Sequence, residues 1–217
     1  MISDPFSATL SPQATPSKLG AQVRGTGLIS TRNWIRHRYD ASTYRRILER
    51  FGTGHSLDLS NIIAPTWYPI EVVDSLWDGV REVAYGSLSL EQQQSSFEAA
   101  MVENGRYIAA DNLGSIYRVY LTLFSSPLRL VKALPRFGET YFHQIDVEPE
   151  VPDPKEGWAR CRARGLEGVR HIAPVICGWL TYALDMVGAR SPKVEEKNYR
   201  LGVYDPEELH FEIFWLS

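Results

Sequence analysis

The sequence predicts an α+β fold in which an N-terminal helical half precedes an antiparallel sheet of β-β-α-β-β order. Apolar residues recur at helical spacing through the first two thirds of the chain. From Phe137 onward, apolar and polar residues alternate with a period of two, which is typical of half-buried strands. A chain of 217 residues can bury one core. We therefore expect a single domain at 21–217, with a helical part at 28–135 and a sheet part at 137–217.

The composition is that of an ordinary soluble globular protein. Hydrophobic residues make up 44% of the chain, and the net charge of −3 provides no broad attraction to nucleic acid or anionic lipid. The longest apolar stretch, 171–189, contains Pro174 and Asp185, so it predicts a buried helix and not a membrane span. Two cysteines are too few for a disulfide scaffold, and we expect a cytoplasmic location. Residues 1–20 are rich in Ser, Thr and Pro without a signal-peptide core, which predicts a disordered tail.

Capping residues and apolar stripes mark the helical half. Asp40 is a typical N-cap and Gly52 a typical C-cap for a helix at 41–51. In "IEVVDSLWDGVREVAYG" (70–86), apolar residues recur every three or four positions and form one face. Pro135 is expected to stop the last helix, because proline cannot continue it. The other helices are expected at 30–40, 91–110, 114–124 and 127–134.

The sheet half begins with an alternating segment, "ETYFHQIDVEPEV" (139–151). Its period of two predicts one apolar face that contains Tyr141, His143, Ile145 and Val147. The turn residues "PDPKEG" follow, and a second alternating segment at 158–165 completes a hairpin. A helix at 172–188 and strands near 193–203 and 209–215 give the β-β-α-β-β order.

Several short segments resemble a myxobacterial paralogous family of roughly this length and unknown function. They are "VRGTGL", "YPIEVVDSLW", "FEAAMVENGRYIAADN", "LFSSPLRLVKALPRFGETYF" and the C-terminal "YRLGVY" and "LHFEIFW", and the resemblance covers about 23–216. The order of elements is also distantly similar to the superfamily of 4-vinyl reductase domains, haem-nitric-oxide/oxygen-binding domains and TRAPP vesicle-tethering subunits. This resemblance implies a ligand-binding or regulatory scaffold and not an enzyme with a fixed catalytic set.

We therefore expect a non-catalytic sensing or adaptor domain of a bacterial signalling system. Its pocket would be apolar and would lie between the helices and the sheet. Aromatic residues make up 12% of the chain and supply the candidate lining. A small apolar ligand and a protein partner are both consistent with this interpretation, and a homodimer remains open. The candidate pocket residues are Trp77, Tyr107, Tyr120, Tyr141, His143 and Trp179.

Haem is an alternative that the resemblance raises. Haem-nitric-oxide-binding domains hold their haem through a helical histidine just before a proline-containing junction, but this sequence has no histidine between His55 and His143. Tyr117, Tyr120 or His143 would have to substitute as the iron ligand. No bound cofactor is therefore the leading expectation.

A metal site is the second alternative. If the hairpin turns around Asp153, His143 lies opposite Ala163 and diagonal to Cys161, and packing of the next helix on the same face would bring Cys177 close. One histidine and two thiols suit zinc, but a closed zinc site needs a fourth ligand, which is not evident. The favoured interpretation is a hydrogen-bonded core histidine beside two buried thiols.

A row of arginines alternates along the second strand of the hairpin. Arg160, Arg162 and Arg164, together with Arg200, could hold an anionic ligand or the carboxylates of a partner. The favoured interpretation is a solvated sheet face with cross-strand ion pairs.

Enzyme motifs are not evident. The sequence has no G-x-S-x-G elbow, and "GTGHS" (52–56) lacks the Lys-Ser/Thr ending of a phosphate-binding loop. His210 and Glu212 share a strand face, which leaves a hydrolase open as a third hypothesis, but no nucleophile is identifiable beside them.

Overall fold

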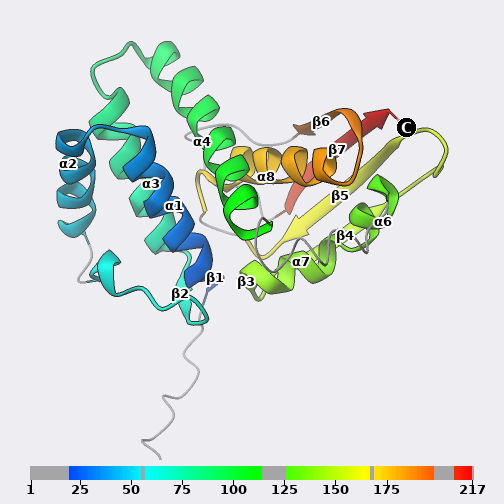
Figure 1. Ribbon diagram of the computed structural model, residues 1–217, viewed down its shortest axis with the longest axis horizontal. Helices are drawn as coiled ribbons and strands as arrows, with labels where there is room; N and C mark the ends of the chain where they lie inside the picture. The colour runs from blue at the N-terminus through cyan, green and yellow to red at the C-terminus, as the bar shows by residue number, and fades with distance from the viewer. Residues whose placement is uncertain (1–19, 55–56, 114–125, 167–168, 198–207, 217) are drawn as a thin grey trace, which may run out of the picture.

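The computed structural model describes residues 20–54, 57–113, 126–166, 169–197 and 208–216. A helical part and a sheet part lie side by side, and the long helix α4 runs between them (Figure 1). The buried apolar side chains of both parts form one continuous core. Among the described residues, no helix is long and apolar enough to cross a membrane.

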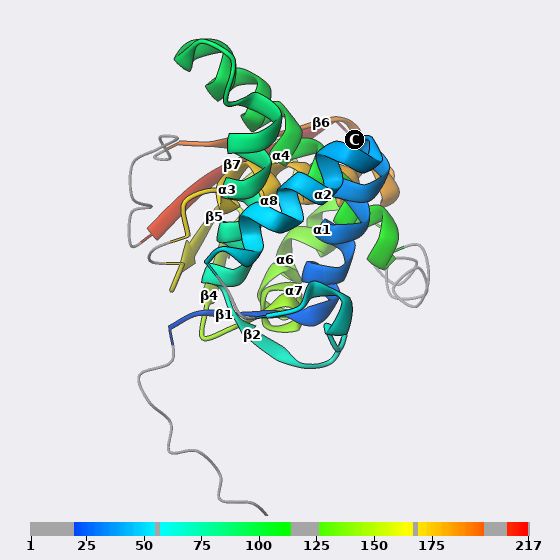
Figure 2. The ribbon, with the colours of Figure 1, turned by 90° about the vertical axis from the view of Figure 1, so that its left-hand side faces the viewer.

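The helical part has the elements that its periodicity predicts. In Figure 2, α1 and α2 face the viewer in front of the sheet part. Asp40 caps α2 by accepting hydrogen bonds from the backbone amides of Ser42 (2.9 Å) and Thr43 (3.1 Å). The expected helix at 114–124 lies outside the described residues. The helices are α1 (Gly25–Arg38), α2 (Ala41–Gly52), the 3-10 helix η1 (Leu59–Asn61), α3 (Glu71–Tyr85), α4 (Leu90–Leu113), α6 (Pro127–Lys132), α7 (Leu134–Tyr141) and α8 (Ile172–Met186).

The sequence pattern did not predict the α-helix α7. Pro135 does not stop the helical half but lies in the first turn of α7, where a proline needs no amide hydrogen. Leu134, Phe137 and Tyr141 are buried on one face of α7 at a spacing of three and four residues. Phe137 and Tyr141 fit the helical period as well as the strand period, which is why the alternation misled.

The described residues form two antiparallel sheets, of order β2-β1-β3 and β4-β5-β7-β6. The β-β-α-β-β order of the second sheet, with α8 between β5 and β6, is confirmed. The strands are β1 (Gln22–Arg24), β2 (Trp67–Pro69), β3 (Phe142–His143), β4 (Asp146–Glu150), β5 (Trp158–Arg164), β6 (Arg190–Glu196) and β7 (Glu208–Leu216).

The expected strand at 139–151 is split between these two sheets. Gln144 has a positive φ of 66°, and the chain changes direction there. As a result His143 pairs with Gln22 in the small sheet, whereas β4 pairs with β5. Val147, and not His143, lies opposite Ala163.

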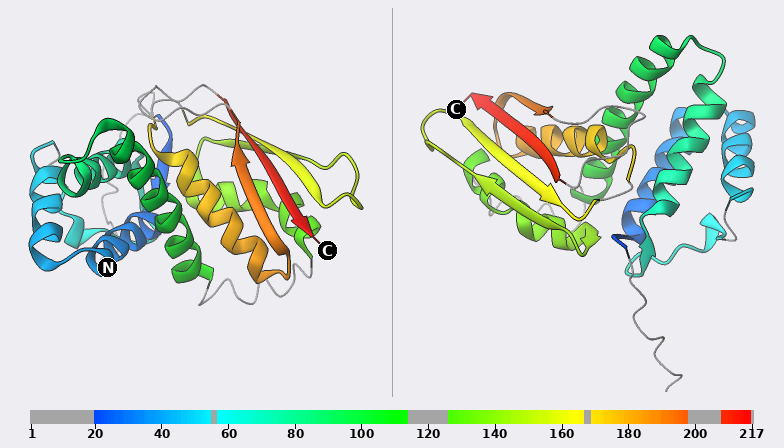
Figure 3. Two further views of the ribbon diagram at one scale, coloured as in Figure 1. Left: turned by 90° about the horizontal axis from the view of Figure 1, so that it is seen from above. Right: turned by 180° about the vertical axis from the view of Figure 1, so that it is seen from behind.

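The larger sheet has one apolar face and one charged face. Ala159, Cys161 and Ala163 of β5 are buried on the inner face, as the alternation predicts. Helix α8 lies against this face, and α7 lies beside β4 (Figure 3). The outer face carries the arginines of β5 and their acidic partners.

Helices α4 and α8 cross at two glycines and join the two parts. A Cβ atom on Gly105 would lie 2.0 Å from the carbonyl oxygen of Val175. A Cβ atom on Gly178 would lie 2.0 Å from the carbonyl oxygen of Val102. The two backbones are therefore closer than any other residue type would allow.

Candidate functional site

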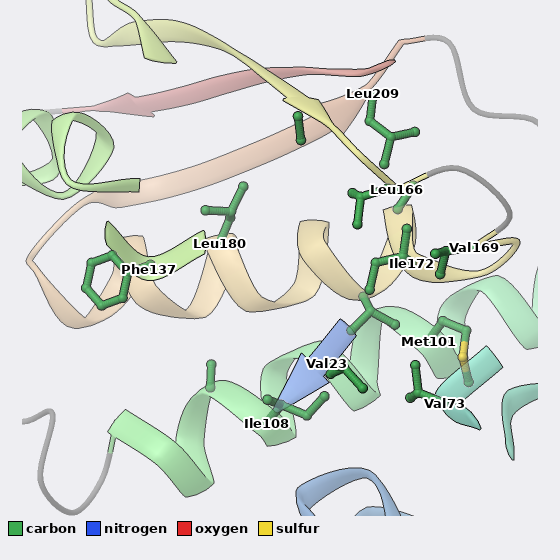
Figure 4. Close-up of a cluster of buried hydrophobic side chains, with 14 of the residues drawn as sticks. Val23, Val73, Met101, Ile108, Phe137, Leu166, Val169, Ile172, Leu180 and Leu209 are labelled. Carbon is green, nitrogen blue, oxygen red and sulfur yellow. The ribbon is translucent and has the colours of Figure 1, made fainter. Parts of the chain in front are cut away.

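An apolar cavity of about 120 Å³ lies between the helical part and the sheet part. Val23 of β1, Val73 of α3 and Ile108 of α4 line it from the helical part. Phe137 of α7 and Leu180 of α8 line it from the other side. Figure 4 shows these five side chains in the buried cluster around α8, with Leu180 on the side of α8 that faces the larger sheet. A molecule in the cavity would contact both parts of the fold at once.

The surface that the cavity presents is wholly apolar. Two of the lining residues with a polar group, Trp77 and Thr31, direct it to a buried amide. The indole nitrogen of Trp77 donates to Asn104 Oδ1 at 3.1 Å, and the Thr31 hydroxyl donates to the same atom at 3.5 Å. Asn104 is completely buried. Its Nδ2 has no hydrogen-bond partner among the described residues.

Aromatic rings form one wall of the cavity. The Trp179 ring lies 5.4 Å from Phe137 and 5.8 Å from Tyr141, measured between centroids, and all three residues line the cavity. Tilted and edge-on contacts of this kind are favourable between aromatic rings. The Trp179 Nε1 atom is buried and has no hydrogen-bond partner within the described part of the chain.

Half of the candidate pocket residues line this cavity. Trp77, Tyr141 and Trp179 do so, from three different helices. Tyr107 instead contacts α1, where its hydroxyl lies 3.2 Å from His37 Nδ1. Tyr120 lies outside the described residues.

His143 does not lie on the apolar face. It is exposed, and its ring packs against Trp67 of β2 with 5.6 Å between the centroids. The cause is the break at Gln144, which places His143 in the small sheet and away from the larger one. The expectation that His143 enters the core was wrong.

The alternative metal ligands are not brought together. No group of three or more His, Cys, Asp or Glu residues suited to a metal ion occurs in the part of the chain that the structure describes. Cys161 lines the cavity from β5 and Cys177 lies in α8. Burial raises the pKa of each thiol to about 12. Both therefore stay protonated at neutral pH, whereas metals bind the thiolate.

The arginines of β5 are neutralised by acidic neighbours. Arg162 lies 2.9 Å from Glu148, and Arg164 lies 3.2 Å from Glu148 and 3.5 Å from Glu208. Arg160 pairs with Glu212 at 3.9 Å and lies over the ring of Trp158. Arg200 lies outside the described residues. The expected cross-strand ion pairs are therefore present on this face.

Sequence reasoning missed a polar cluster at the junction of α3 and α8, formed by Asp74, Asp78, Arg170 and His171. Arg170 donates from Nε and from its backbone amide to Asp74, at 2.9 Å and 3.1 Å, and its guanidinium also contacts Asp78. His171 Nε2 lies 3.0 Å from Asp78 Oδ1. The sequence signal was available: two carboxylates four residues apart interrupt the apolar stripe of 70–86.

The pKa values of the two carboxylates of this cluster shift in opposite directions. Asp74 is only 3% exposed, and desolvation raises its pKa above the usual value in spite of Arg170. Burial also acts to raise the pKa of Asp78, but the hydrogen bond with His171 and the nearby cationic charges outweigh it and lower the pKa. The cluster thus ties the helical part to the start of α8 through a buried charged contact.

The fold and the site define an α+β domain that holds an apolar cavity between a helical part and a sheet part. This is the fold of H-NOX proteins, the haem-nitric-oxide/oxygen-binding domains. The sequence matches no protein-family model and no curated protein. The myxobacterial family therefore stays a prediction, whereas the expected fold class is confirmed.

Three solved structures illustrate the likeness. An Fe(II) unliganded H-NOX variant from K. algicida has a TM-score of 0.67 at 9% identity, over 89% of this chain and 97% of that chain. An H-NOX protein from S. oneidensis in the Fe(II)NO state has a TM-score of 0.60 at 12% identity, over 89% and 99%. An oxygen-binding H-NOX domain related to soluble guanylate cyclases has a TM-score of 0.60 at 10% identity, over 89% and 95%.

Proposed function

We propose that this protein is a non-catalytic sensor domain that binds a small molecule in the cavity between its two parts. The observation that carries the proposal is the cavity itself, because it is apolar and both parts of the fold line it. Apolar clefts between structural units are common ligand sites. The likeness to H-NOX proteins, two of which are described as NO-bound and oxygen-bound, supports a sensing role.

Occupancy of the cavity has a route to the rest of the molecule. Val73 and Trp77 of α3 line the cavity, while Asp74 and Asp78 of the same helix bind the segment before α8. Ile172, the first residue of α8, lines the cavity again. A ligand that moves α3 relative to α8 must therefore alter the polar cluster. Signalling to a protein partner would follow from that movement.

Haem is the cofactor named for a structural neighbour, and the described lining residues do not fit it. Iron needs an axial ligand, and no histidine lines the cavity among the described residues. Tyr141 is the described tyrosine of the lining, and Tyr117 and Tyr120, the substitutes that the sequence offered, lie outside the described residues. Cys161 is the lining thiol, but its raised pKa keeps it protonated. Haem also carries two propionates, yet no lysine or arginine of the described lining could pair with them. We therefore favour a haem-free sensor over the alternative that uses His143, Cys161 and Cys177.

Native mass spectrometry of freshly purified protein, together with an absorption spectrum, tests the proposal. Extra bound mass that disappears on denaturation is the expected result, with no Soret band. A protein that carries no ligand, and that no compound of a chemically diverse library stabilises against heat, would contradict the sensor proposal and would favour a pure protein-interaction role. A Soret band would establish the haem alternative instead.

A further inference from the structure

We infer that the ligand is a neutral, apolar molecule of about the size of one six-membered ring. The inference rests on the proposed function and adds the chemical class of the ligand. It differs from what the fold family suggests, because haem is large, charged and ligated through iron. Three properties of the cavity carry it: its size, the direction of its polar groups and the character of its walls.

The size of the cavity sets the upper limit. Its volume of about 120 Å³ is close to that of an engineered apolar protein cavity of about 150 Å³, which stays dry and binds benzene. A single ring or a short hydrocarbon fills such a space. A fused-ring compound or a porphyrin is larger than this space. Helix α8, which lines the cavity, is held in backbone contact with α4 at Gly105 and Gly178.

The polar groups near the cavity exclude ligands that depend on hydrogen bonds. Trp77 and Thr31 already donate to Asn104 and present only carbon to the cavity. The thiol of Cys161 is protonated and is a weak hydrogen-bonding group. The indole nitrogen of Trp179 has no partner among the described residues, but it is buried, and the surface that the cavity presents is wholly apolar. A hydroxyl or carboxylate at that surface would lose its water without gaining a hydrogen bond, which is costly for a hydroxyl and more so for a charge.

The walls favour a ring. Phe137, Tyr141, Trp179 and Phe211 line the cavity together with Trp77. The aromatic side chains of the walls can contact a bound ring through their faces or their edges. A bound ring can therefore adopt the tilted and edge-on contacts that Trp179 already makes with Phe137 and Tyr141. Burial of apolar ligand surface is then the driving force.

Titrations with benzene, phenol, benzoate and hemin test the inference, with thermal unfolding and tryptophan fluorescence as readouts. Benzene is expected to bind with a dissociation constant of about 0.1–1 mM, since six heavy atoms limit the affinity. At ten times that concentration the melting temperature should rise by about 3–6 °C. Phenol should bind at least about tenfold more weakly, and benzoate and hemin should not bind.

Variants of β5 show whether binding occurs in this cavity. Ala163→Ile adds carbon atoms at a lining position and should abolish the benzene response, and Ala163→Val should weaken it. Ala159→Val is the matched control, because Ala159 is buried on the same face of the same strand but does not line the cavity. It should keep wild-type affinity for benzene. Circular dichroism checks that each variant is folded.

Each remaining outcome overturns a distinct statement. If phenol or benzoate binds more tightly than benzene and Ala163→Ile abolishes that binding, the ligand class is wrong while the proposed sensor function stands. If hemin binds with a Soret band that Ala163→Ile removes, the exclusion of haem is wrong. If benzene binds equally to wild type and Ala163→Ile, the site is wrong. If none of the four probes and no other compound binds, the inference and the proposed function fail together.

Discussion

The crossing of α4 and α8 is expected to be intolerant of a single added methyl group. In Gly178→Ala the new Cβ would lie 2.0 Å from the carbonyl oxygen of Val102, whereas ordinary contact begins near 3.4 Å. The helices would have to move apart by the difference, 3.4 − 2.0 = 1.4 Å. Overpacking of a close contact costs about 1–3 kcal/mol, and a separation of this size belongs at the upper end. Alanine regains about 1 kcal/mol of helix propensity, so we expect a net destabilisation of about 2 kcal/mol.

Urea unfolding followed by circular dichroism measures this cost, and Gly52→Ala is the control. Gly52 ends α2, and a Cβ atom there meets nothing within 4 Å. The control should therefore be neutral or slightly stabilising. If Gly178→Ala unfolds at the same urea concentration as Gly52→Ala, the helices are not in backbone contact and the rigid junction assumed for the cavity does not exist.

Three further predictions follow from the described contacts. Asp74→Ala removes both hydrogen bonds to Arg170 and should lower the free energy of unfolding, measured by urea denaturation, by about 2 kcal/mol. Asp74→Asn should recover part of this loss, and equal losses in the two variants would refute the hydrogen-bonding role. Hydrogen bonds from Lys193 and Lys197 lower the pKa of Glu195 to about 2, so the stabilising contribution of Glu195 is present at neutral pH and declines as the pH falls from about 4.5 toward 2. The difference in melting temperature between wild type and Glu195→Gln should therefore be larger at pH 7 than at pH 3. A difference that does not change with pH would contradict this contribution. Buried Cys161 and half-buried Cys177, both with a pKa raised to about 12 by desolvation, should react with a disulfide reagent at pH 8 far more slowly than in guanidinium chloride, and rapid labelling of Cys161 in the native protein would contradict its burial.

The helical half illustrates how far local patterns determine structure. Asp40 and the stripe of 70–86 predict α2 and α3 nearly to the residue, because capping and periodicity act within a few turns. The same reasoning failed at Pro135. Its fixed φ suits the first turn of a helix as well as the end of one, and only the buried positions of Phe137 and Tyr141 distinguish the two cases.

The sequence predicted the character and the place of the cavity but only some of the residues that line it. The structure has an apolar space between helices and sheet with Trp77, Tyr141 and Trp179 in its wall, and the prediction that these residues bind a ligand is still to be tested. His143 was misplaced because one residue with positive φ, Gln144, moved it to another sheet. The sequence could not show this, since alternation looks the same on either side of such a break.

By itself the sequence determined the change from a helical half to a β-β-α-β-β half, the inner and outer faces of β5, and the lack of a histidine between His55 and His143. These properties depend on periods of two and of 3.6 residues and on composition, which act over short stretches of chain. The tertiary structure alone decided which residues meet across the two parts: Gly105 with Val175, Asp74 with Arg170, and the walls of the cavity. Contacts between distant segments depend on how the helices and sheets pack in space, and no local pattern encodes that packing.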